Sequence, residues 1–281
     1  MQTLRSGAWS SAICVELERG EYVVRFAQTP DDFYCDANAA KLSTEHLPIP
    51  KVHGIGKIGS RYWCISDRMP GIHLDDLNED EMASTLPSIA RMLIAMRAVP
   101  TENSSGFGGW NANGDGVFSS FAAQLLDVRN DVPDARGGGW SPILNRHEFE
   151  RQIFGRGTIL LEQLCRFLPV QRHLIHEDTL NRNVVVLNNT ISGVFDWGTA
   201  MWGDPVYDLA WFRFWDPWYP KWSDLNIPGY LEAEVGFEGE FAEERMHCCL
   251  LHIGLMHIRY NAFIGNLAAM NDVALATEKL L

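Results

Sequence analysis

The chain has 281 residues, 46% hydrophobic and 21% charged, an ordinary globular composition with enough apolar residues for a sizeable core. No apolar run reaches the about 18 residues that a membrane span needs, and the N-terminus lacks a charged-then-apolar signal pattern. These features predict a cytoplasmic protein without a membrane partner. The formal net charge of -13 argues against nucleic acid as a partner, because phosphate backbones require a basic surface.

The same acidity leaves two interpretations open. It is compatible with a cationic small molecule that is attracted by the field of the protein, and it is equally compatible with charge that only maintains solubility. The six cysteines show no paired CxxC spacing and stand among apolar neighbours. The pattern therefore predicts buried free thiols in place of disulfides or a zinc site.

The first 66 residues are predicted to form a small antiparallel sheet with one helix. Strands are expected over 10–17, 21–26, 52–58 and 61–66, and a helix over 31–46, ended by Pro48. The small residues from Ser6 to Ser10 could form a loop that covers phosphates with backbone N–H groups, although they lack a GxGxxG or Walker A pattern.

Residues 67–71, with Pro70 and Gly71, are predicted to link this lobe to a second one. Beyond them the spacing of apolar residues is mostly helical. Helices are expected over 80–100, 119–128, 148–168 and 240–265 and in the final segment, with a glycine-rich loop over 130–140. We therefore predict an α+β protein with lobes 1–66 and 72–281, joined by the linker 67–71.

The stretch from residue 173 to 208 holds the densest chemistry. Two strands are expected around the turn Asn188–Asn189, and they would bring Asp178, Asn183 and Asp196 to one end of a hairpin. Carboxylate and amide oxygens at such a place suit Mg²⁺ and a transferred phosphoryl group. All three could instead be ordinary turn residues, because Asn and Asp favour turns.

The spacing of these residues favours the chemical interpretation. His176 precedes Asp178 by two positions and Asn183 follows it by five, which is the H-x-D-x-x-x-x-N spacing of a protein-kinase catalytic loop. We interpret His176 as a structural residue beneath that loop. Either Asp204 or Asp208, in the turn that follows, is expected to stabilise the loop by hydrogen bonds.

The stretch from His176 to Trp197 resembles the signature of aminoglycoside phosphotransferases, in which an Asp-Trp pair replaces the kinase Asp-Phe-Gly. The likeness, which is closest to the hygromycin B phosphotransferases of that family, continues in order over most of the chain through the following segments: 22–25, 32–34, 47–50, 62–66, 105–108 and 200–204. The resemblance implies a two-lobed protein-kinase-like fold. It also implies transfer of the γ-phosphoryl group of ATP or GTP, with Mg²⁺, to a hydroxyl of an aminocyclitol antibiotic, hygromycin B first.

By resemblance, Asp178 orients and deprotonates the acceptor hydroxyl, and Asn183 and Asp196 hold Mg²⁺. Arg25 occupies the place of the lysine that holds nucleotide phosphates in most kinases of this fold, and an arginine can perform the same role. A carboxylate on the first helix would position this cation, and Asp36 is preferred over Asp32.

The resemblance also implies the remaining contacts of the nucleotide. Ser66, Asp67 and Arg68 would form the hinge that pairs with the base, with Met69 nearby. Ser10 would lie at the end of the phosphate-covering loop.

On the acceptor side the resemblance implies contacts from Glu177, Asn181, Arg182, Trp215 and Trp218. Glu177 and Arg182 are larger and more highly charged than the residues usual at those places, so they are expected to influence which substrate fits. The two tryptophans could stack on sugar rings or could be ordinary core.

The protein is expected to act as a monomer on a nucleotide and a cationic aminoglycoside. Two alternatives stay open from the sequence. One is a kinase of the same fold that acts on another amino alcohol, sugar or aminoglycoside, because one fold hosts many acceptors. The other is a non-catalytic, pseudokinase-like module that only binds nucleotide.

Overall fold

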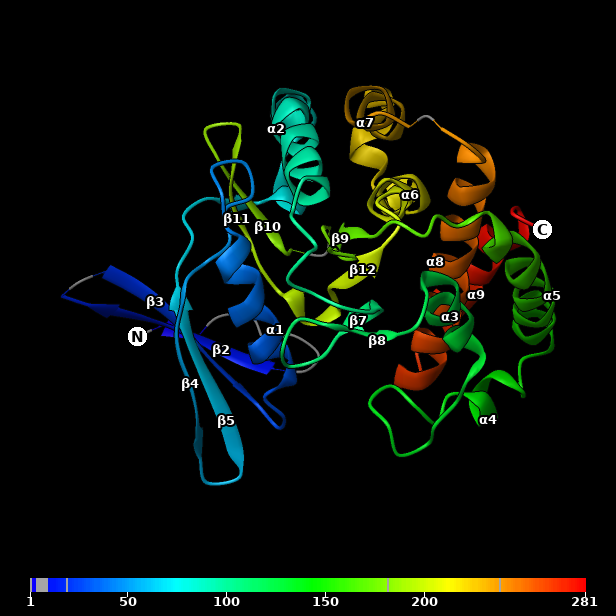
Figure 1. The fold of residues 1–281 in the computed structure, drawn as a ribbon, viewed down its shortest axis with the longest axis horizontal. Coiled ribbons are helices and arrows are strands. Elements are labelled where there is room, and N and C mark those ends of the chain that lie inside the picture. The colour runs from blue at the N-terminus through cyan, green and yellow to red at the C-terminus, as the bar shows by residue number, and fades with distance from the viewer. Residues whose placement is uncertain (1, 4–9, 19, 181, 238) are drawn as a thin grey trace.

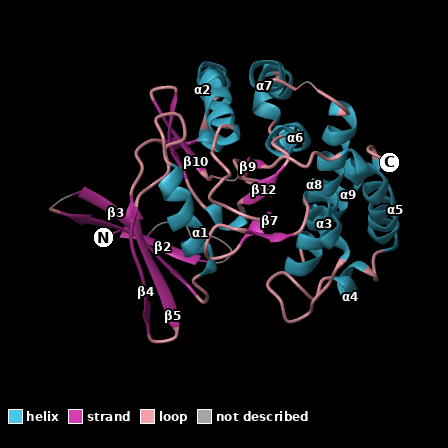
Figure 2. Ribbon diagram, viewed as in Figure 1, coloured by secondary structure: helices cyan, strands magenta, loops and turns pink. Residues whose placement is uncertain are grey.

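The structure is a computed structural model, and it describes residues 2–3, 10–18, 20–180, 182–237 and 239–281. Figures 1 and 2 show a sheet-rich lobe at the N-terminal end beside a larger, mainly helical lobe. The predicted α+β class and two-lobed arrangement are confirmed. The loop predicted over Ser6 to Ser10 lies outside the described residues except for Ser10.

The N-terminal lobe is built on a five-stranded antiparallel sheet in the order β1-β2-β3-β5-β4. Its strands are β1 (Gln2–Thr3), β2 (Ser10–Leu17), β3 (Gly20–Ala27), β4 (Val52–Ile58) and β5 (Arg61–Asp67). The four predicted strands are thus present within one residue of their expected ends. Arg25 lies in the central strand β3, opposite Ala12 on one side and Cys64 on the other.

Helix α1 (Asp31–Ala39) is the one α-helix among the described residues of this lobe, and it ends earlier than the sequence predicted. A 3-10 turn (Ala40–Leu42) follows it, and Ser43 is already extended. The backbone groups of Thr44 and Leu47 then bond to each other, at 3.0 and 3.3 Å. Leu47 is fully buried, so this local turn and its anchor in the core replace further helix.

The predicted linker leads into a short strand that the sequence did not suggest. Strand β6 (Ile72–His73) pairs with β10 (Val184–Leu187), which forms the expected hairpin with β11 (Thr190–Val194). Gly71 has φ 130°, and a Cβ there would lie 2.5 Å from the Val186 carbonyl oxygen. Only glycine permits this close approach of the two backbones.

A second small sheet of the C-terminal lobe has the order β8-β7-β12-β9. Its strands are β7 (Phe107–Trp110), β8 (Gly116–Phe118), β9 (His173–Ile175) and β12 (Met201–Gly203). The sequence did not predict this sheet, because three or four residues give no readable alternation and their partners are distant in the chain. Since β9 ends immediately before His176, the sheet fixes the start of the catalytic loop.

The remaining elements of the C-terminal lobe are helices, and α8 runs through their middle against α5, α6 and α9 (Figure 1). They are α2 (Glu79–Arg97), α3 (Phe121–Leu126), α4 (Ser141–Leu144), α5 (Glu148–Leu164), α6 (Val206–Trp215), α7 (Ile227–Val235), α8 (Ala242–Ile264) and α9 (Leu267–Glu278). The five predicted helices correspond to α2, α3, α5, α8 and α9. Helix α6 was obscured by its own composition, because a segment that is apolar on all sides has no helical period.

The six cysteines are free and buried, as predicted. Among the described residues no helix is both long and apolar enough to cross a membrane. One large core lies mainly in the C-terminal lobe and also takes in Ala39, Leu47 and Ile49. A small separate cluster around Phe33 and Cys64 supports the N-terminal sheet.

Candidate active site

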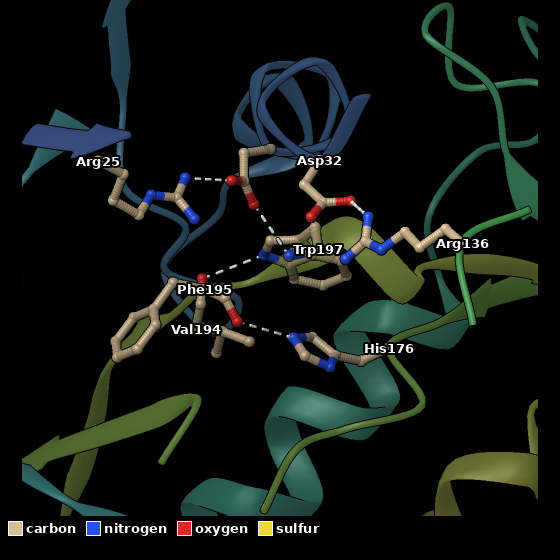
Figure 3. A network of polar contacts seen from close by, with 8 residues as sticks. Arg25, Asp32, Arg136, His176, Val194, Phe195 and Trp197 are labelled. Atoms are coloured by element: carbon tan, nitrogen blue, oxygen red, sulfur yellow. Dashed lines mark hydrogen bonds and ion pairs between the residues drawn. The ribbon is translucent and has the colours of Figure 1, made fainter. Parts of the chain in front are cut away.

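Strand β11 delivers Asp196 in a left-handed conformation, with φ 66°. Aspartate tolerates this conformation better than most residues. The neighbouring Trp197 is fully buried, and its indole N–H donates to the Val194 carbonyl at 3.1 Å (Figure 3). The Trp197 backbone N–H donates to the Asp36 carboxylate of α1 at 2.9 Å. The Asp-Trp pair is thus the point where the end of β11 meets α1.

The catalytic loop begins at His176, whose imidazole is completely buried. Its Nε2 donates to the Phe195 carbonyl at 3.1 Å, and its Nδ1 accepts the Asp178 backbone N–H at 3.2 Å. Burial lowers the pKa of His176 to about 4, so the ring is neutral near pH 7. His176 therefore joins the end of β11 to the loop, with both ring nitrogens engaged in hydrogen bonds.

Asp178 and Asn183 are brought together by the turn between them. The Asn183 amide nitrogen donates to both the backbone oxygen and the carboxylate of Asp178, each at 2.9 Å. The Phe195 backbone N–H donates to the Asn183 carbonyl at 3.0 Å. Because both amide hydrogen atoms of Asn183 are engaged with Asp178, its side-chain oxygen stays available as a ligand.

A carboxylate beneath the loop holds its first half. Asp208 of α6 is buried and accepts the backbone N–H groups of His176 and Glu177 at 3.2 and 3.0 Å. Burial raises the pKa of Asp208 to about 7, against the effect of these two bonds. Asp204 instead accepts two bonds from Arg245, both at 2.7 Å. Of the two candidates, Asp208 is the one that stabilises the loop.

The second half of the loop is held from the side by the 3-10 turn Leu74–Asp76. The Arg182 backbone N–H donates to the Asp75 carboxylate at 2.7 Å, and its guanidinium pairs with Asp76 at 2.8 Å. Arg182 has φ 69°, so it also is left-handed. The positive charge of Arg182, next to the expected acceptor, is therefore neutralised by Asp76.

The cation expected at the nucleotide phosphates is also paired. The Arg25 guanidinium bonds to the carboxylate of Asp36 and lies 5.2 Å from the centre of the Phe33 ring. Burial alone would lower the pKa of Arg25, but the opposite effect of Asp36 and other nearby groups is larger overall. The net pKa is raised, so the guanidinium stays charged. Asp36 thus binds both Arg25 and the Trp197 N–H, whereas Asp32, the other candidate, pairs with Arg136 (Figure 3).

The donor set fits Mg²⁺. Asp196 is exposed, and its carboxylate accepts no side-chain or backbone hydrogen bond within the described part of the chain. Although part of the residue is exposed, desolvation of the carboxyl raises the pKa of Asp196 to about 6; Asp36 adds to this shift, and Arg25 opposes it. A bound divalent cation would favour the charged carboxylate and so offset the cost of desolvation. Among the described residues no group of three or more His, Cys, Asp or Glu could hold a metal. Asn183 and Asp196 therefore suit an ion that keeps water and phosphate oxygens as its other ligands.

The other residues predicted for the nucleotide lie along β2, β5 and the linker. Ser66 is buried at the end of β5, and Met69 lies against Gly193 of β11, where an added Cβ would be 2.5 Å away. The exposed Arg68 pairs with Glu21 at 2.8 Å. Ser10 begins β2 and is half-buried.

The residues predicted for the acceptor have different surroundings. Glu177 is only 9% exposed and lies close to Asp208 and Tyr207, so little of it could contact a substrate. Trp218 is 38% exposed and packs edge-to-face on Trp215, with ring centres 5.0 Å apart. Asn181 lies outside the described residues. Trp218 and the side chain of Arg182, each 38% exposed, are therefore accessible to a ligand, whereas Glu177 is not.

Two groups of residues at this site were not predicted from the sequence. Asp75 and Asp76 lie about one hundred positions before Arg182, and Arg136 lies within a glycine-rich loop without a motif. All three act through contacts between segments that are distant in the chain. No local pattern of residue types could have found them.

Comparisons with known proteins identify the family of the chain. The model of the phosphotransferase enzyme family (APH) matches residues 1–247. The hygromycin-B 4-O-kinase of Escherichia coli is 30% identical over 272 residues, which cover 95% of this chain and 76% of that protein.

Solved structures add the same relation in three dimensions. A thermostable mutant of aminoglycoside phosphotransferase APH(4)-Ia, in complex with AMP-PNP and hygromycin B, superimposes with a TM-score of 0.88. The two are 27% identical, and the match covers 99% of this chain and 92% of the other. A spectinomycin phosphotransferase shares the fold at 11% identity, with a TM-score of 0.59 over 99% of this chain and 88% of its own. This chain therefore belongs to the phosphotransferase enzyme family.

Proposed function

We propose that this chain transfers the γ-phosphoryl group of ATP or GTP to a hydroxyl of an aminocyclitol antibiotic, hygromycin B first. The similarity to the hygromycin-B 4-O-kinase of E. coli and to APH(4)-Ia in complex with hygromycin B supports this acceptor. The observation that carries the proposal is the joining of Asp178 and Asn183 by two 2.9 Å hydrogen bonds, beside the end of the strand that bears Asp196.

Asp178 would orient the acceptor hydroxyl and take its proton as the phosphoryl group moves. Asn183 and Asp196 would hold Mg²⁺, which neutralises charge on the phosphate oxygens when it is bound. The bonds from Asn183 keep the Asp178 carboxylate in one orientation, so one of its oxygens can face the hydroxyl.

The sheet lobe would bind the nucleotide. Arg25 would contact the phosphates, with Asp36 keeping its guanidinium in place. Ser66, Arg68 and Met69 would surround the base, and Ser10 would lie near the phosphates. We keep the predicted lobes 1–66 and 72–281, with the linker 67–71, as part of this proposal.

The helical lobe would bind the antibiotic. The exposed Trp218, with Trp215 behind it, offers an apolar surface for sugar rings. Glu177, Asn181 and Arg182 would shape the space next to Asp178. The formal net charge of -13 favours the approach of a polycationic aminoglycoside. We propose that the protein works as a monomer in the cytoplasm, where its nucleotide is found, without nucleic acid or membrane as a partner.

An assay of phosphorylation by the purified chain tests the proposal. Hygromycin B, other aminoglycosides and simple amino alcohols are each supplied with ATP or GTP and Mg²⁺, and the phosphorylated product is identified by mass spectrometry. We expect turnover with hygromycin B. Turnover with an amino alcohol alone would favour a different kinase of this fold, and nucleotide binding without any turnover would favour a non-catalytic module.

Asp178→Ala is the decisive variant. Loss of a positioned base costs about 10²- to 10⁴-fold, so kcat should fall by about that factor while the Kd for nucleotide changes little. Asp272→Ala, an exposed aspartate of α9, serves as the control for the loss of one carboxylate. An Asp178→Ala protein with the turnover of the wild type would refute the proposed role of this residue.

A further inference from the structure

The glycine-rich loop over 130–140 has a defined conformation that is held by its own hydrogen bonds. The Asp131 carboxylate accepts the backbone N–H groups of Gly139 and Ser141, at 2.5 and 2.8 Å, and so closes the base of the loop. Inside it, the Gly138 N–H donates to the Ala135 carbonyl at 2.9 Å. A Cβ on Gly138 would lie 1.8 Å from the Val132 carbonyl oxygen, so only glycine permits this path.

The loop is also anchored to the helical lobe at both ends. Before it, the Val128 carbonyl accepts a bond from Arg259 of α8 at 3.2 Å. After it, Trp140 is 3% exposed and packs on Phe154 of α5, with ring centres 5.2 Å apart. The tip of the loop is therefore carried by a fixed base on the helical lobe.

Arg136, near that tip, reaches the other lobe. Its guanidinium pairs with Asp32 in the first turn of α1, and Figure 3 shows the pair beside Trp197. Asp32 in turn lies against the turn that follows Asp196, because a Cβ on Gly198 would be 2.8 Å from the Asp32 carboxyl carbon. The ion pair therefore forms where α1 meets the Asp-Trp turn.

Asp32 and Asp36 are four positions apart, so they share one face of α1. Asp36 binds the Trp197 N–H and Arg25, and Asp32 binds Arg136. We propose that Arg136 is a positioning residue: through Asp32 it holds α1 against the helical lobe and thereby places Arg25 for the nucleotide. This inference rests on the proposed function only in assigning the nucleotide phosphates to Arg25.

The accessibility of the pair suits such a role. The Arg136 side chain is 43% exposed and that of Asp32 is 17% exposed, so water partly screens the attraction. The bond can therefore contribute to the position of α1 without locking the lobes. Because the apparent affinity of a ligand falls with the fraction of protein in the competent arrangement, a loosened α1 should weaken nucleotide binding before it affects the chemical step.

The test compares Arg136→Gln and Asp32→Asn with two matched controls in the full-length protein. Arg129→Gln removes a similar arginine near the start of the loop, where it pairs with Glu162 inside the helical lobe at 3.4 Å. Asp31→Asn removes the exposed carboxylate that precedes Asp32 in the first turn of α1. The readouts are amide hydrogen exchange of residues 31–39 without ligands, the Kd for a non-hydrolysable ATP analogue, and kcat and KM.

We expect Arg136→Gln and Asp32→Asn to speed exchange in α1 and to raise the Kd and KM for nucleotide by about threefold to tenfold, with a smaller change in kcat. The double variant should bind nucleotide with the same Kd as either single variant, because both changes remove the same bond. The controls should match the wild type in these measurements.

Two outcomes would overturn the inference. One is unchanged exchange and nucleotide Kd in Arg136→Gln. The other is a loss of kcat in Arg136→Gln that Asp32→Asn does not reproduce, since this would place Arg136 on the transferred phosphoryl group. If the wild type bound nucleotide but phosphorylated no aminoglycoside, the proposed acceptor would fail, while exchange and Kd would still decide the role of Arg136.

Discussion

At each end of the catalytic loop a carboxylate binds the backbone N–H of a left-handed residue, but the two ends have different surroundings. Glu177 and Arg182 both have a left-handed backbone, with φ 76° and 69°. Each donates its backbone N–H to a carboxylate, Glu177 to Asp208 at 3.0 Å and Arg182 to Asp75 at 2.7 Å. Asp208 is 3% exposed in the core, whereas Asp75 is half-buried on a short 3-10 turn.

This difference explains how the loop can be fixed at one end and adaptable at the other. At the buried end no water can replace the carboxylate, so a lost bond leaves a polar group unsatisfied. At the other end Asp75 is only half-buried, and the guanidinium of Arg182 extends to the exposed Asp76. The fully buried end should therefore govern stability, and the half-buried end should adjust the geometry next to the acceptor.

Asp208→Ala should have the largest effect on this comparison. Two buried N–H groups lose their acceptor, so the free energy of unfolding should fall by about 3 kcal/mol, and kcat by about 100-fold through displacement of Asp178. Urea unfolding and steady-state kinetics measure both quantities. Asp208→Asn, which keeps one acceptor oxygen, should lose less in each. An Asp208→Ala protein with the stability and turnover of the wild type would show that the bonds to His176 and Glu177 contribute nothing.

Glu177 at one end and Asp76 at the other should respond oppositely to pH. Burial raises the pKa of Glu177 from 4.5 to about 8, and the neighbouring Asp178 and Asp208 add to this shift. The folded state therefore retains a proton that the unfolded state has lost, so this group makes stability fall as pH rises from about 4.5 to 8, by up to about 1.4 kcal/mol per pH unit. Thermal unfolding across this range should show a flatter profile for Glu177→Gln.

For Asp76, at the other end, the sign is reversed, although burial raises the pKa of the neighbouring Asp75. The Arg182 guanidinium lowers the pKa of the Asp76 carboxyl, so the stabilising effect of that pair is present near neutral pH and is lost only as the solution becomes more acidic than the ordinary value of 3.8. Glu177→Gln should leave this acid-side change intact. Equal flattening on both sides would mean that the two ends are not independent.

Asp75→Ala should have the smallest effect. Its single bond to the Arg182 N–H is only half-buried, so the free energy of unfolding should fall by about 1 kcal/mol, while kcat falls by about tenfold as the turn between Asp178 and Asn183 loosens. Asp76→Ala, which removes only the ion pair of the side chain, is the matched control and should change kcat less. Equal losses in the two variants would show that the charge, and not the backbone bond, matters here.

Much of this protein could be read from residues that are close together in the chain. The strands around Arg25, the helices α2, α5 and α8, and the hairpin that brings Asp178, Asn183 and Asp196 together follow from local alternation, helical spacing and turn residues. The spacing from His176 to Asn183 and the Asp-Trp pair also indicated the family. Local patterns carry such information because backbone conformation and motif spacing are set within a few residues.

The tertiary structure alone decided how these residues are held. In the folded chain Asp208 binds the start of the catalytic loop and Asp75 binds the Arg182 backbone N–H. Arg136 pairs with Asp32 across the lobes. The fold also buries Glu177, which the sequence placed beside the substrate. Each of these facts depends on which distant segment packs against the loop, and a pair of charges carries no information about its partner until the chain has folded.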